Sequence, residues 1–189
     1  SVRETFEGVS EVRASTGDNR LGGEDFNQLL IEAFGKAVGD RLSAEQRADP
    51  LLRERIRAAA ERARRALTEG AVATMAVTWK DESFEHAFTA DAFEEMCSGL
   101  LTRLRDPVLR ALRDAGLRAD GLQEIVMVGG ATRMPVVRRA LTRMFGRFPS
   151  NAVDPDHAVA LGAAVQAGLK ARDTALKEVV LTDVCPYSL

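Results

Sequence analysis

The segment IVMVGGATRMPVV, residues 125–137, constrains the fold of this chain more than any other feature. An apolar run ends abruptly at Gly129 and Gly130, and helical spacing of apolar residues then resumes over 134–145. Glycines at the carboxyl end of a buried strand let the main chain approach a ligand, and the following helix offers unpaired N–H groups to an anion. A tight turn without a ligand explains the same glycines, so both interpretations stay open at this point.

A second glycine pair, Gly22 and Gly23, lies between a strand-like segment over 6–16 and a predicted helix over 24–38. The chain therefore contains two strand-to-helix turns of the same chemistry. Two such turns can face one ligand, which favours a phosphate or nucleotide site over two unrelated turns.

An arginine-rich helix is predicted over 51–67, with Pro50 at its start and one apolar stripe. Polar residues spaced i, i+3, i+4 and i+7 share another face of it. A carboxylate there can accept hydrogen bonds from ribose hydroxyls, and a guanidinium plane can stack on a purine. A solvated surface of Glu–Arg pairs is the alternative, and it explains the outer arginines of this helix. The residues of the shared face are Glu61, Arg64, Arg65 and Thr68.

The remaining pattern alternates strands and helices, which is typical of an α/β fold. A hairpin is expected over 71–79 and 83–88, and a helix from Thr89 that is interrupted or kinked at Pro107. Further predicted elements are a strand over 124–128 that is buried on both faces, a helix over 155–170 in which Gly162 allows close packing, and a strand over 178–184.

Composition narrows the class of protein. The 189 residues are 46% hydrophobic and 29% charged, which indicates a folded domain, and the net charge of −2 gives no global attraction to nucleic acid or membrane. No segment reaches the roughly twenty apolar residues of a membrane span. Cys97 and Cys185 lie in no metal-ligand pattern, which favours reduced thiols in a cytoplasmic protein. Because the chain begins at Ser1 and ends in apolar sequence, we expect a piece of a longer polypeptide.

Four segments, in this order, resemble the DnaK-type heat-shock chaperone family, the seventy-kilodalton class, over essentially the whole chain. They are GDNRLGGEDF (17–26), AAAERARRALT (58–68), VMVGGATRMPVVRRAL (126–141) and VDPDHAVALGAAVQAG (153–168). The closing LTDVCPYSL is similar to the HscC branch. The resemblance implies an actin-like ATPase lobe, in which residues 1–21 and 103–189 form a ribonuclease H-like mixed sheet with flanking helices. Residues 22–102 would form an inserted, smaller α+β subdomain.

The resemblance also implies an adenine-nucleotide site. Glu61 would bind the ribose hydroxyls, Arg133 would stack on the base, and Asp156 would line the back of the pocket. The full set of implied nucleotide ligands is Gly22, Gly23, Glu61, Arg64, Arg65, Thr68, Gly129, Gly130, Ala131, Arg133, Met134 and Asp156. Three positions depart from the family pattern: Arg64 is usually lysine, Ala131 usually serine or glutamine, and His157 usually glutamate. The hydroxyl lost at residue 131 costs about 1 kcal/mol.

The implied activity is ATP hydrolysis coupled to the binding of unfolded peptide clients. The catalytic groups and most of the Mg²⁺ contacts would belong to a first lobe that this chain lacks, so we expect no catalytic residue, no metal ligand and no hydrolysis in the chain alone. Implied partners are a J-domain co-chaperone and a nucleotide-exchange factor on the inserted subdomain, with no nucleic acid or membrane. Two alternatives stay open: another actin-like phosphotransferase such as a sugar kinase, and a non-hydrolysing interaction module for exchange factors.

Overall fold

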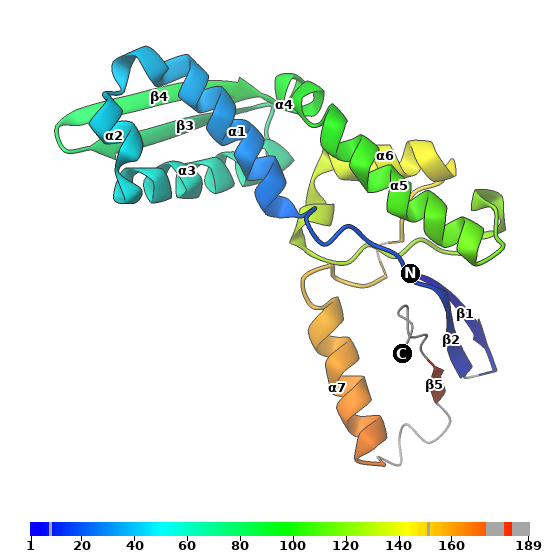
Figure 1. Ribbon diagram of the computed structural model, residues 1–189. Helices are drawn as coiled ribbons and strands as arrows, with labels where there is room; N and C mark the ends of the chain where they lie inside the picture. Colours follow the sequence, from blue (N-terminus) through cyan, green and yellow to red (C-terminus); the bar gives the residue numbers. More distant parts are fainter. Residues whose placement is uncertain (8, 151, 173–179, 183–189) are drawn as a thin grey trace. The chain divides into compact units, whose positions relative to one another are not determined.

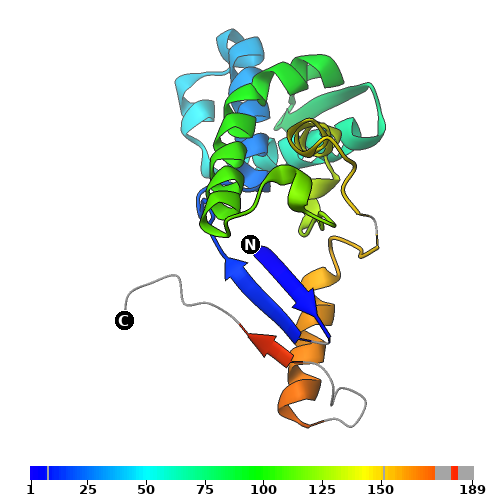
Figure 2. The same ribbon diagram turned by 90° about the vertical axis from the view of Figure 1, so that its right-hand side faces the viewer.

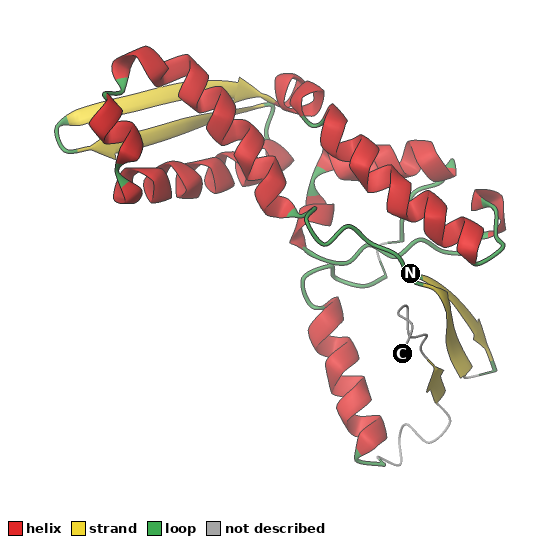
Figure 3. Cartoon of the chain, in the orientation of Figure 1, coloured by secondary structure: helices red, strands yellow, loops and turns green. Residues whose placement is uncertain are grey.

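The computed structural model (Figure 1) describes residues 1–7, 9–150, 152–172 and 180–182, in a mixed α/β chain. The α/β fold class is therefore confirmed. Figure 3 shows the helices and strands by colour. The chain forms two compact units. The first unit comprises Ser1–Asn19, Arg103–Arg133 and Val137–Leu189, and the second comprises Arg20–Thr102 and Met134–Val136.

The second unit is built on an antiparallel hairpin. Strands β3 and β4 pair without a register shift from Val72↔Thr89 to Trp79↔Glu82, and Lys80 takes a positive φ of 53° in the turn. The predicted hairpin is confirmed, with strand ends within one residue of those expected. The elements of this unit are α1 (Gly23–Val38), η1 (Gly39–Arg41), α2 (Ala44–Ala48), α3 (Pro50–Glu69), β3 (Val72–Trp79), β4 (Glu82–Thr89), α4 (Ala90–Met96) and the start of α5 (Ser98–Asp114).

The core of the second unit lies where α3 packs on β3 and on α1. Every second residue of β3 is buried, as a half-buried strand requires. Helix α3 contributes three alanines and two leucines, and α1 contributes larger side chains along one stripe. The core residues are Ala73, Met75 and Val77 of β3, Leu52, Ala59, Ala60, Ala63 and Leu67 of α3, and Phe26, Leu30, Phe34 and Val38 of α1.

Helix α3 begins where the sequence predicts, because Asp49 caps it. The Asp49 carboxylate accepts hydrogen bonds from the N–H groups of Leu51 at 2.8 Å and Leu52 at 3.1 Å. Pro50 occupies the first helical position, where its missing N–H group costs no hydrogen bond. The cap at Asp49 and Pro50 therefore determines where the arginine-rich helix begins, and its apolar stripe determines which face is buried.

The first unit contains a three-stranded mixed sheet in the order β1-β2-β5, in which β1 and β2 are antiparallel and β2 and β5 are parallel. Figure 2 shows the three strands side by side. Helix α6 begins in the second unit and continues in the first. The elements are β1 (Val2–Phe6), β2 (Val9–Ala14), η2 (Ala119–Gly121), η3 (Gly130–Arg133), α6 (Pro135–Phe145), α7 (Ala158–Lys170) and β5 (Val180–Thr182).

Several predicted elements differ from the structure. The strand expected over 6–16 is confirmed as β2 over Val9–Ala14, and a further strand, β1, was not predicted. Strand β1 ends at Phe6, before Glu7 with φ 46°. The helix expected from Thr89 is two helices, which end and begin on either side of Cys97, while Pro107 lies inside α5. Of the strand expected over 178–184, residues 178, 179, 183 and 184 lie outside the described residues.

The predicted strand over 124–128, buried on both faces, is wrong. Val126 forms an isolated parallel bridge with Ser150 and is 49% exposed, and Val128 is 46% exposed. Met127 alone of these three is buried, at 4%. A strand in the interior of a sheet needs a neighbouring strand on each side. Within the described residues, this apolar run pairs with one residue only, Ser150.

Cys97 is fully buried at the junction of α4 and α5. Burial, with a smaller effect of the Glu94 carboxylate, raises the pKa of its thiol from 9.0 to about 12. We expect the thiol of a Cys185→Ser variant to resist a disulfide-exchange reagent near pH 8 in the native state and to react rapidly in guanidinium chloride. Rapid, stoichiometric labelling of the native variant would contradict this burial.

The same shift makes stability depend on pH. The pKa of the Cys97 thiol is higher in the folded chain than in the unfolded chain. The stability that the protonated thiol contributes is therefore fully present below about pH 9, and it is lost as the pH rises toward about 12.

Candidate functional site

The predicted site residues divide between the two units, and each group is described by itself. The second unit holds Gly22, Gly23, Glu61, Arg64, Arg65, Thr68 and Met134, and the first unit holds Gly129, Gly130, Ala131, Arg133 and Asp156.

The turn at Gly22 precedes α1 in the second unit. The Gly22 N–H group donates to Asp25 Oδ2 at 2.7 Å, so the first turn of α1 caps its own start. Gly22 has an extended φ of −158°, which any residue can adopt, and a Cβ added there would meet nothing within 4 Å. A need for positive φ therefore does not explain this glycine, and the space beside it is open.

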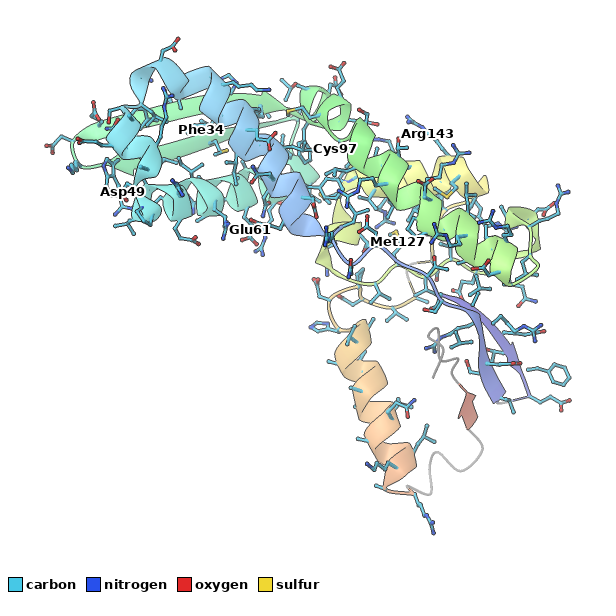
Figure 4. All side chains as sticks on the ribbon, in the orientation of Figure 1. Phe34, Asp49, Glu61, Cys97, Met127 and Arg143 are labelled. Atoms are coloured by element: carbon cyan, nitrogen blue, oxygen red, sulfur yellow. The ribbon has the colours of Figure 1, made fainter. Side chains whose placement is uncertain are left out.

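The polar face of α3 carries Glu61 and Arg65 (Figure 4 labels Glu61). Arg65 Nη2 lies 2.6 Å from Glu61 Oε1, and the two side chains are 73% and 43% exposed. An exposed i,i+4 pair of this kind contributes little to stability, so both groups can exchange their mutual bond for a ligand at low cost. The Thr68 hydroxyl donates to the Arg64 carbonyl at 3.3 Å.

Arg64 takes a different position from its predicted neighbours. Its side chain turns between α3 and α1, where Nε donates to Asn27 Oδ1 at 2.8 Å, and burial lowers its pKa below the ordinary value. Asn27 is a polar residue among the buried residues of α1, between Phe26 and Leu30. Sequence reasoning missed Asn27, although a polar residue within such a set is a usable signal.

The glycine turn of the first unit is closed by backbone bonds. Gly129 has a φ of 95°, and its N–H group donates to the Pro155 carbonyl at 2.8 Å. The Thr132 hydroxyl and N–H group both donate to the Gly129 carbonyl, at 2.7 and 3.0 Å. At Gly129 the positive φ itself requires glycine, as the ligand-free interpretation predicts, and the short helix η3 follows directly.

Arg133, at the end of η3, is held by two carboxylates. Its Nε donates to Asp156 Oδ2 at 2.8 Å, and its Nη2 lies 3.0 Å from Asp154 Oδ1 and 2.7 Å from Asp156 Oδ2. The hydrogen bond that Arg133 donates to the Asp156 carboxylate is the main cause that raises the pKa of Arg133. The backbone N–H group of Asp156 is the main cause that lowers the pKa of Asp154. Asp154 is a second partner that sequence reasoning did not assign.

Gly130 and Met134 complete this description. A Cβ added at Gly130 would lie 3.2 Å from Asp156 Oδ1, so the turn and the carboxylate leave little room between them. Met134 is 2% exposed, so its side chain is buried. Ala131 is partly buried beside Gly130 in η3.

Two further properties concern ligands and membranes. In the ranges that the structure describes, no three His, Cys, Asp or Glu side chains are grouped so that they could hold a metal ion. Within the same residues, we find no helix with the length and apolar character needed to cross a membrane.

The fold and these turns define a mixed α/β protein with two glycine-containing turns before helices. Comparison with known proteins then gives the family: the family described as Hsp70 protein matches residues 1–189, and the chain belongs to it. The chain is 39% identical over 195 residues to chaperone protein DnaK of Trichormus variabilis, covering all of this chain and 28% of that protein. It is 37% identical over 197 residues to chaperone protein DnaK of Deinococcus proteolyticus, covering 100% of this chain and 31% of that protein. The chain thus spans less than a third of these relatives.

Proposed function

We propose that this chain is the adenine-nucleotide-binding lobe of a cytoplasmic DnaK-type chaperone ATPase. In the whole protein, ATP binding and hydrolysis would be coupled to the binding of unfolded peptide clients. The family match over residues 1–189 favours this function over a sugar kinase or a non-hydrolysing interaction module. The proposed fold is an actin-like lobe formed by 1–21 and 103–189, with 22–102 as an inserted subdomain.

The observation that carries the proposal is the state of Arg133. Two carboxylates hold its guanidinium by Nε and Nη2, which fixes the plane while the side chain stays 48% exposed. A fixed guanidinium plane can stack on a purine ring at low entropic cost. The adjoining Gly130 places backbone without a side chain beside Asp156, where a bulkier residue would obstruct a ligand.

Each group of site residues is proposed to contact adenine nucleotide. In the second unit, Glu61 would accept hydrogen bonds from the ribose hydroxyls, while Arg65 and Thr68 would face the base. In the first unit, the turn at Gly129 and Gly130 would approach the phosphates, with Ala131 beside it. Gly22, Gly23, Met134 and Asp156 complete the proposed set. Mg²⁺ would be bound mainly through the phosphates and through parts of the protein outside this chain.

The proposed partners follow from the same family. A J-domain co-chaperone would stimulate hydrolysis, and a nucleotide-exchange factor would bind the inserted subdomain. We propose no nucleic-acid or membrane partner. By itself the chain should bind nucleotide without hydrolysing it, because the groups that align water and the γ-phosphate would lie elsewhere. If the chain alone hydrolyses ATP, and Glu61→Ala abolishes this activity, the prediction that the chain binds nucleotide without hydrolysing it is contradicted.

Titration calorimetry with ADP tests the ribose contact. Glu61→Ala should weaken binding about tenfold or more, because hydrogen bonds to a charged acceptor are lost. Glu54→Ala is the matched control: Glu54 lies on the same helix, its side chain is 67% exposed, and Arg57 Nη1 lies 3.7 Å from its carboxylate. Equal affinities for the two variants would remove Glu61 from the site.

A further inference from the structure

Two polar side chains are buried in the described part of the chain, and they bind each other. Asn27 of α1 is 4% exposed and Arg64 of α3 is 9% exposed, whereas the other buried side chains there are hydrophobic. A guanidinium can only donate hydrogen bonds, so the Asn27 amide must present its oxygen to Arg64 Nε, at 2.8 Å. This bond therefore also sets the direction in which the Asn27 amide nitrogen points.

The Asn27 amide nitrogen continues the connection to the start of α1. It donates to Glu24 Oε2 at 2.8 Å, and Glu24 Oε1 lies 3.0 Å from Arg57 Nε. The first turn of α1 is thus bonded to α3 at two positions, Arg57 and Arg64, which are seven residues apart and share one face of that helix. We refer to Glu24, Asn27, Arg57 and Arg64 as the α1–α3 clamp.

Along α3, the two clamp arginines lie on either side of the position proposed to bind ribose. Glu61 lies between Arg57 and Arg64 along α3, and Glu24 directly follows the turn at Gly22 and Gly23. A shift of α3 along α1 would therefore change how far Glu61 lies from that turn. The exposed pair of Glu61 and Arg65 cannot prevent such a shift, because both residues belong to α3.

We infer that Asn27 is a positioning residue that acts through Arg64: it holds the Glu61 segment of α3 in register with the turn at Gly22 and Gly23, and so sets the recognition of ribose hydroxyls. This inference rests on the proposed function. It gives Arg64 a role inside the unit in place of the direct base contact that the family resemblance implies. A polar pair retained in an apolar interface is a known means of fixing register.

The test compares ADP with 2′,3′-dideoxy-ADP, which lacks the hydroxyls that Glu61 would bind. Native chain should prefer ADP by about tenfold. In Asn27→Leu, which removes both amide bonds, this preference should fall close to one. Gln28→Ala is the matched control, since Gln28 is exposed on the same helix and bonds Glu32 at 3.0 Å; it should keep the native preference. General destabilisation would weaken both ligands equally and leave the ratio unchanged.

The outcomes separate the inference from the proposed function. If native chain binds no ADP, or shows no preference that Glu61→Ala removes, the proposed function fails and the inference with it. If native chain and Glu61→Ala behave as expected but Asn27→Leu keeps the native preference, the inference alone is overturned. Should Asn27→Leu fail to fold by circular dichroism, Asn27→Ala makes the same comparison with a smaller side chain.

Discussion

Leu52→Ala should lower the free energy of unfolding by about 2 to 5 kcal/mol, which is the largest effect on stability that we predict for a single substitution. Leu52 is 1% exposed in the first turn of α3, next to its capping residue Asp49. Truncation removes buried apolar surface and leaves a cavity that the surrounding helices fill only in part. Urea denaturation followed by circular dichroism measures the loss.

The adjacent residue provides the control. Leu51 is 57% exposed, so Leu51→Ala should change the free energy of unfolding by no more than about 0.5 kcal/mol. Both substitutions place alanine in the same helical turn, so helix propensity affects them alike. Equal losses for the two variants would contradict the orientation of α3.

Gly130→Ala should weaken ADP binding about tenfold or more, the largest effect that we expect at the first-unit glycine turn. The new Cβ would lie 3.2 Å from Asp156 Oδ1, so the carboxylate, whose Oδ2 binds Arg133 Nε and Nη2, must shift by a few tenths of an ångström. The methyl group also enters the space where the backbone would approach phosphate. Titration calorimetry with ADP measures the change.

Gly121→Ala is the control for Gly130→Ala. Gly121 also lies in a short 3-10 helix, and a Cβ added there would meet nothing within 4 Å. Its affinity for ADP should equal that of the native chain. If Gly130→Ala binds ADP as tightly as Gly121→Ala does, the glycine turn is a structural turn only.

Local signals made much of the second unit predictable. The cap at Asp49 with Pro50, the apolar stripe of α3 and the alternation along β3 each depend on residues close in sequence. Such signals determine an element's start and its buried face. The pairing of β3 with β4 was predicted from the polar turn at Lys80, Asp81 and Glu82, and Glu82 proves to be the first residue of β4, paired with Trp79.

Predictions that depended on residues distant in the sequence were less accurate than those based on local signals. The run around Val126 has the composition of a central strand, but that composition does not supply neighbouring strands on both sides. Gly162 was expected to permit close helix packing, yet a Cβ added there would meet nothing within 4 Å. Helix α7 starts at Ala158, later than the expected residue 155, because Asp154 and Asp156 form the turn that holds Arg133.

The candidate site shows the same division. Helical spacing correctly grouped Glu61 with Arg65, which lie 2.6 Å apart. It could not show that Arg64 is drawn into the helix pair, because that depends on Asn27, which lies 37 residues earlier. Likewise, the role of Asp154 depends on the position of Arg133, 21 residues earlier.

The central claim is that this chain binds adenine nucleotide through its glycine turns and the Glu61 face of α3. The most direct measurement is the ¹H–¹⁵N correlation spectrum of the chain during titration with ADP. We predict saturable shifts of the amide signals of Gly23, Gly129 and Gly130 and of residues around Glu61, with the signal of Gly121 unchanged. An unchanged spectrum, or shifts confined to the β3–β4 hairpin, would contradict the claim.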